Sequence, residues 1–129
     1  MACAANPNYT WPILPLVNAR RDLRGIWGTS DTNLWTVGAN GRIARYNGND
    51  WSATDQGANA LSGIWGSSAN DIWVVGANGF GYHYNGTTWQ PTSSQSLTNH
   101  DLTGVWSDRK GNVWAVGNSS VGAGTIFKY

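Results

Sequence analysis

Hydrophobic positions recur along this chain with a period close to 40 residues and in the same internal order. An apolar run with a central Trp begins at Leu23, Leu61 and Leu102, and a second Trp-containing run follows each of them. The Trp pairs are Trp27 and Trp35, Trp65 and Trp73, and Trp106 and Trp114. Self-similarity at this period is the signature of a repeat architecture in which each repeat is one supersecondary unit.

Each repeat has the pattern of four short strands. The second run, such as residues 72–75, is almost continuously apolar, as expected for a strand covered on both faces. The third strand alternates, so that Ile43 and Arg45 point one way while Arg42, Ala44 and Tyr46 point the other. A fourth strand carries Trp51 or Trp89 near the rim of the unit. The pattern therefore predicts an all-β protein.

Turn residues separate the predicted strands. Asn40-Gly41 and Asn78-Gly79 tolerate positive φ at both central positions and predict tight hairpins. A second Asn-Gly pair precedes each fourth strand, at Asn47 and at Asn85. Three polar residues stand two positions before the second Trp of each repeat, and we expect them to bond to the backbone of the preceding turn. They are Asn33, Asp71 and Asn112.

The repeats divide the chain into one domain with a permuted strand order. Residues 23–60 form the first repeat, 61–101 the second, and 102–129 a third that lacks its outer strand. Residues 7–22 hold an orphan outer strand with Trp11, followed by a linker, and residues 1–6 are expected to be disordered. Because the orphan strand matches the piece missing from the third repeat, we expect an N-terminal strand to complete that sheet and protect its edge.

Composition excludes several classes of protein. The 129 residues include nine Trp, 17 Gly, 14 Asn and no Glu, so good helix formers are scarce and turn formers abundant. Eight basic and seven acidic residues leave a net charge of +1, which offers no basic field for nucleic acid. No apolar run is long enough to span a membrane.

The segment Asp108–Gly117 resembles the Asp-x-x-Gly-x-Leu-Trp-x-Gly core of sensor-type blades in Trp-rich bacterial β-propellers, and the repeats are also similar to lectin-type blades. The resemblance implies three four-stranded blades per chain. A propeller ring has four to eight blades, so three require self-association, with a six-bladed homodimer favoured over a homotrimer. One alternative is a fragment of a longer propeller. Another is a monomeric β-trefoil or other threefold β fold, although the Gln-x-Trp repeat of trefoils is absent.

Candidate catalytic residues are sparse. Without Glu, hydrolysis by paired carboxylates would need two Asp residues, and most Asp residues fall in predicted turns. His83 is expected on a strand face, and His100-Asp101 is the one candidate general-base pair. The sequence predicts no enzyme, no cofactor and no metal site.

Binding fits the composition better. Trp beside Asn, Ser and Thr suits a multivalent lectin, because aromatic faces hold the apolar side of a sugar and amides or hydroxyls hold its OH groups. The candidate ligand-binding residues are Trp11, Trp51, Trp89, Arg24, Arg42 and Arg45. The six Trp residues of the first and second strands are expected in the core instead. A structural or protein-interaction propeller assembled from short chains, without a small ligand, is the alternative.

The N-terminus bears on localisation. Cys3 is the only cysteine and has no partner for an internal disulfide. A Cys followed by small and polar residues is how a processed bacterial lipoprotein begins, which favours a secreted or cell-envelope location. An ordinary disordered terminus with a free thiol is the alternative.

Overall fold

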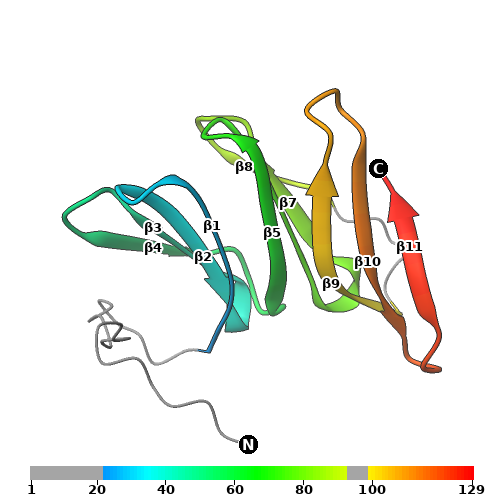
Figure 1. Cartoon of the computed structure of the whole chain (residues 1–129). Helices are drawn as coiled ribbons and strands as arrows, with labels where there is room; N and C mark the ends of the chain where they lie inside the picture. The colour runs from blue at the N-terminus through cyan, green and yellow to red at the C-terminus, as the bar shows by residue number, and fades with distance from the viewer. Residues whose placement is uncertain (1–21, 93–98) are drawn as a thin grey trace, which may run out of the picture.

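The computed structural model describes residues 22–92 and 99–129, and these residues form an all-β molecule. The predictions for Cys3, Trp11 and the orphan N-terminal strand lie outside the described residues. Three separate antiparallel sheets follow one another along the chain, as Figure 1 shows.

The first two sheets each contain four strands in simple chain order. The first sheet consists of β1 (Leu23–Ser30), β2 (Asn33–Gly38), β3 (Arg42–Tyr46) and β4 (Trp51–Asp55). The second sheet consists of β5 (Leu61–Ser68), β6 (Asp71–Gly76), β7 (Gly81–Tyr84) and β8 (Trp89–Pro91). The third sheet has three described strands, in the order β11-β10-β9. They are β9 (His100–Ser107), β10 (Val113–Ser119) and β11 (Gly124–Lys128).

Equivalent residues occupy equivalent positions in the three sheets. Trp27 pairs with Trp35 in the first sheet, Trp65 with Trp73 in the second, and Trp106 with Trp114 in the third. The first two sheets also share two register shifts, at the same positions of β1 and β5. The sequence repeats are therefore structural repeats, down to the pairing of single residues.

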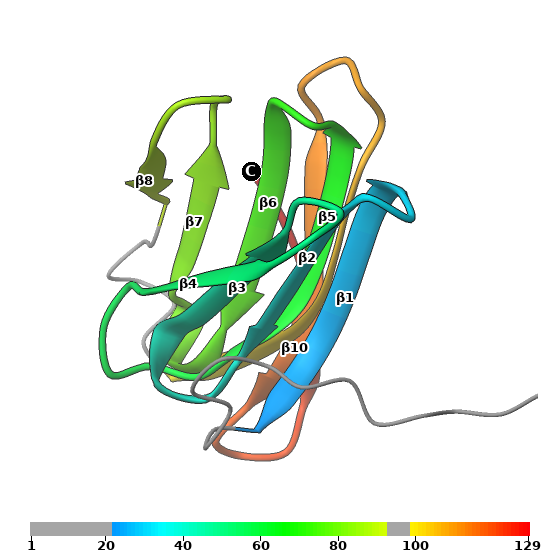
Figure 2. The same cartoon turned by 90° about the vertical axis from the view of Figure 1, so that its left-hand side faces the viewer.

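The sheets pack face to face, with β1, β5 and β9 as neighbours in that order (Figure 1), and Figure 2 shows β5 beside β1. Small residues allow this approach. A Cβ atom on Gly63 of β5 would lie 3.1 Å from the Cα atom of Gly104 on β9. The glycine at the third position of β5 thus lets the neighbouring backbone pass closely.

Two hydrophobic clusters lie between the sheets. Between the first and second sheets, Val37, Ile43, Leu61, Ile72 and Val74 are buried with Trp35. The second cluster, between the second and third sheets, is smaller and contains Val75, Leu102 and Ala115. The core therefore lies between sheets, as the continuous apolar second strands predict.

Of the six Trp residues expected in the core, Trp35 is buried, and Trp27, Trp65 and Trp73 are half-buried. Trp106 and Trp114 differ from the expectation, because both remain exposed in a single chain. Their face of the third sheet is covered by no further sheet among the described residues.

Two kinds of hairpin arise from the Asn-Gly pairs. Asn40 and Gly41 both have positive φ, as do Asn78 and Gly79, which confirms the prediction for the short 3-10 turns η1 (Ala39–Gly41) and η2 (Ala77–Gly79). Asn47 instead accepts backbone hydrogen bonds from Asn49 and Asp50 at 2.9 Å. Asn85 does the same for Thr87 and Thr88.

Candidate functional site

A set of polar interactions surrounds Trp73 on the second sheet. Asp71 accepts hydrogen bonds from Ser67, from the Trp73 indole at 3.1 Å and from His83 at 2.6 Å. The His83 ring stacks on Trp73 with 4.1 Å between centroids. His83 lies on the face of β7, as expected, and is held there in a network with Asp71 and Trp73.

This cluster combines Ser, Asp and His in an order unlike that of a catalytic triad. In a triad the imidazole lies between the hydroxyl and the carboxylate, so that it can take the proton of the nucleophile. Here the carboxylate of Asp71 lies between Ser67 and His83. Ser67 therefore hydrogen-bonds to the carboxylate of Asp71. In this arrangement His83 does not act as a general base for the Ser67 hydroxyl.

The electrostatics of Asp71 reflect the same contacts. Burial alone would raise the pKa of Asp71, but the hydrogen bonds from Ser67, His83 and Trp73, together with the charge of His83, outweigh it. The net pKa of Asp71 lies below that of an ordinary aspartate. The cluster thus stabilises the carboxylate and fixes the edge of the Trp73 ring.

A basic side chain accompanies the second-strand Trp in every sheet. The Arg45 guanidinium lies 5.0 Å from the Trp35 ring centroid, His83 stacks on Trp73, and the Lys128 ammonium lies 5.6 Å from the Trp114 ring. Arg45 also donates a hydrogen bond to Asn33 at 3.3 Å. In these positions the bases cover indole faces through cation–π or stacking contacts.

The other predicted binding residues are spread over the molecule. Trp89 packs edge-on against Trp35 at 5.7 Å and lies beside Tyr84 at 5.1 Å. Trp51 lies 5.2 Å from Tyr46, and Arg42 forms an ion pair with Asp55 at 2.9 Å. Arg24 is exposed on β1. The described candidates therefore do not converge on one pocket.

The candidate general-base pair is also separated. Asp101 accepts a hydrogen bond from the backbone N–H of Asn78 at 3.0 Å, while the His100 ring meets Phe127 edge-on at 5.1 Å. In the described part of the chain, no group of three or more His, Cys, Asp or Glu residues could hold a metal ion. Nor is any helix within residues 22–92 and 99–129 long and apolar enough to cross a membrane.

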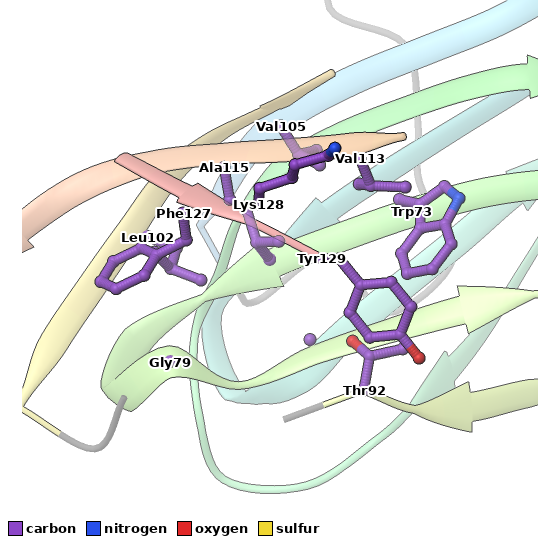
Figure 3. A pocket seen from close by; sticks show the side chains of 12 residues that line it. Trp73, Gly79, Thr92, Leu102, Val105, Val113, Ala115, Phe127, Lys128 and Tyr129 are labelled. Atoms are coloured by element: carbon purple, nitrogen blue, oxygen red, sulfur yellow. The ribbon is translucent and has the colours of Figure 1, made fainter. Parts of the chain in front are cut away.

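A cavity of about 300 Å³ lies between the second and third sheets. Trp73 and Tyr129 meet here at 4.9 Å between ring centroids. Figure 3 shows these rings and Thr92 at one end of the cavity, with Leu102 and Phe127 at the other. Val75, Gly79, Gly81, Val105, Val113, Ala115 and Lys128 complete the lining.

One substitution between the repeats helps to explain the cavity. Gly81 pairs with Val75 as Ile43 pairs with Val37, so the two residues are equivalent. Ile43 is buried between the first and second sheets, whereas Gly81 lines the cavity without a side chain, and the Thr92 hydroxyl lies 2.8 Å from where its Cβ atom would be. The difference between Ile43 and Gly81 is visible in the sequence. It predicts a cavity only if both residues are known to face the next sheet.

Comparison with protein-family models, curated proteins and solved structures finds no match for this chain.

Proposed function

We propose that the three sheets are blades of a β-propeller and that the protein is a non-catalytic, lectin-like binding module. Hydrogen-bonded ladders run within each sheet, and among the described residues no ladder pairs strands of different sheets. This favours blades over a trefoil, in which strands of different repeats pair in a common barrel. The Trp35–Tyr84 and Trp73–Tyr129 contacts, one at each inter-sheet boundary, agree with stacked blades.

The cavity beside Trp73 and Tyr129 is the observation that carries the ligand proposal. Its volume lies at the lower end of the range of small-molecule sites. Tyr129 is largely exposed and offers a ring face at one end, while the Thr92 and Tyr129 hydroxyls can exchange hydrogen bonds with sugar OH groups. Among the described residues, Lys128 has the only charged side chain in the lining, and its ammonium lies over Trp114, so the side chains of the cavity suit a neutral sugar ring.

Titration with a panel of neutral mono- and oligosaccharides, followed by Trp fluorescence and calorimetry, tests the proposal. We expect Tyr129→Ala to weaken binding by about tenfold and Thr92→Val by a few-fold, since one buried hydrogen bond contributes about 1 kcal/mol. Val121→Ala, at a strongly exposed turn outside the cavity, is the matched control.

Two results would contradict this assignment. Absence of binding to every sugar at millimolar concentration would remove the lectin function. Binding that survives Tyr129→Ala but is lost in Trp51→Ala or Trp89→Ala would move the site to the outer strands, where the sequence predicts it.

A further inference from the structure

The two outermost faces of the sheet stack are apolar although nothing described covers them. On the outer face of the third sheet, Trp106, Trp114, Val116 and Ile126 are exposed. On the outer face of the first sheet, Leu23 and Ile26 are exposed. Contiguous apolar surface of this kind marks an interaction site.

Internal equivalents show what these residues do when a neighbouring sheet is present. Ile126 pairs with Val116 as Ile43 pairs with Val37, yet Ile126 is 71% exposed and Ile43 only 2%. Trp114 is 40% exposed, against 5% for the equivalent Trp35. At the opposite end, Leu23 is 42% exposed, while the equivalent Leu61 is completely buried. The equivalent side chains are thus core residues at the boundary between the first and second sheets.

The contacts at the internal boundaries give the expected geometry. Trp35 of the first sheet meets Tyr84 of the second at 5.2 Å and Trp89 at 5.7 Å. The first sheet carries its own pair in the place of Tyr84 and Trp89, namely Tyr46 and Trp51. Both pairs have nearly the same geometry, with centroids 5.2 and 5.1 Å apart and planes at 33° and 36°.

A second contact recurs between the first strands of neighbouring sheets, in which a Trp lies against the next sheet. Trp27 of β1 lies against Gly66 of β5, where a Cβ atom would come within 2.5 Å of the indole. Trp65 of β5 donates its indole N–H to the Ser107 carbonyl of β9 at 3.3 Å. Trp106 is the next Trp in this series, and Gly28 of β1 is equivalent to Gly66.

We propose that a second copy of this chain docks head to tail, with its first sheet on the outer face of the third sheet. Trp114 then packs against Tyr46 and Trp51 of the second copy, and Trp106 lies against its Gly28. The interface continues one that the chain already forms twice, which favours a second copy over an unrelated partner. It is heterologous, so it closes when two copies complete a six-sheet ring. It rests on the proposed blade arrangement and not on the proposed ligand.

Sedimentation velocity on the full chain tests the interface through one variant for each face. The wild-type protein should sediment as a species with twice the mass of one chain, which is 13.9 kDa. Ile26→Glu blocks the outer face of the first sheet, and Trp114→Glu blocks that of the third; each should lower the mass toward that of a single chain. Val121→Glu places the same charge on an exposed apolar residue in the β10–β11 turn and should leave the mass unchanged.

Mixing the two variants separates head-to-tail docking from other modes. Ile26→Glu retains an intact third sheet and Trp114→Glu an intact first sheet, so an equimolar mixture should recover one interface and form a two-chain species. Far-UV circular dichroism and cooperative unfolding establish that each variant is folded. A monomeric wild type, a dimer that survives both substitutions, or folded variants that fail to associate on mixing would each overturn the proposal, whatever the outcome of the sugar titrations.

Discussion

Asp71 illustrates how a single residue gives one repeat a character that the others lack. The equivalent position holds Asn33 in the first sheet, which donates to Thr29 and accepts from Arg45. In the third sheet Asn112 donates to Asp108 at 2.6 Å. All three side chains bond mainly to other side chains, in place of the expected turn backbone. Asp71 alone is ionisable, and it alone pairs with a His.

The depressed pKa of Asp71 leads to a prediction about acid stability. Because the folded pKa lies below the unfolded value, the carboxylate stabilises the fold above about pH 4, and this stability is lost as pH falls through the folded pKa. Asp71→Asn should cost about 1 kcal/mol at pH 7, since the group is partly exposed. It should also flatten the decline in stability between about pH 5 and 2.

Urea unfolding at pH 7, 5 and 3 measures both effects. Asp31→Asn in the exposed β1–β2 turn is the control and should change neither the stability nor its pH dependence. An Asp71→Asn protein with the wild-type acid profile would show that Asp71 is not the group that senses pH.

At the scale of elements, one dipeptide makes two different turns. Asn40-Gly41 reverses the chain with two left-handed residues. In Asn47-Gly48 only the Gly has positive φ, and the Asn side chain accepts the N–H groups of the following residues. The sequence predicts hairpins at both places because the signals are local. It does not distinguish the types, because that depends on the strand register on either side.

The side-chain-capped turns allow a test of how independent the sheets are. Asn47→Ala and Asn85→Ala each remove an acceptor of two backbone hydrogen bonds, so each should destabilise the protein by about 1 kcal/mol. The two turns lie in different sheets and share no partner, so the double variant should lose the sum of the two effects within about 0.5 kcal/mol. Chemical denaturation of the four proteins measures this, and a clear excess or deficit would show that the outer hairpins are coupled.

At the scale of the whole molecule, the repeats account for most of what the sequence could predict. Strand order, Trp pairing and the two buried layers follow from periodicity, because each repeat buries its apolar run against the next. The Asp71–His83 contact and the cavity at Gly81 depend on cross-strand register and on which face meets a neighbour. Exposure of Trp106 and Trp114 could not be predicted either, because a repeat pattern assigns every copy to the core and does not mark where the stack of sheets stops.

The proposed docking of a second copy also predicts how stability depends on protein concentration. If association buries Trp114 and Ile126 against Tyr46 and Trp51, mass action adds the association free energy to folding, and the Tm should rise by a few degrees per tenfold increase in concentration. Trp114→Glu should unfold at a Tm that is independent of concentration, because its remaining contacts lie within one chain. Differential scanning calorimetry over a hundredfold range of concentration measures both slopes, with Val121→Glu as the control that should retain the wild-type slope. A wild-type Tm that is constant over this range would mean that the exposed aromatic face contributes nothing to the folded state by association.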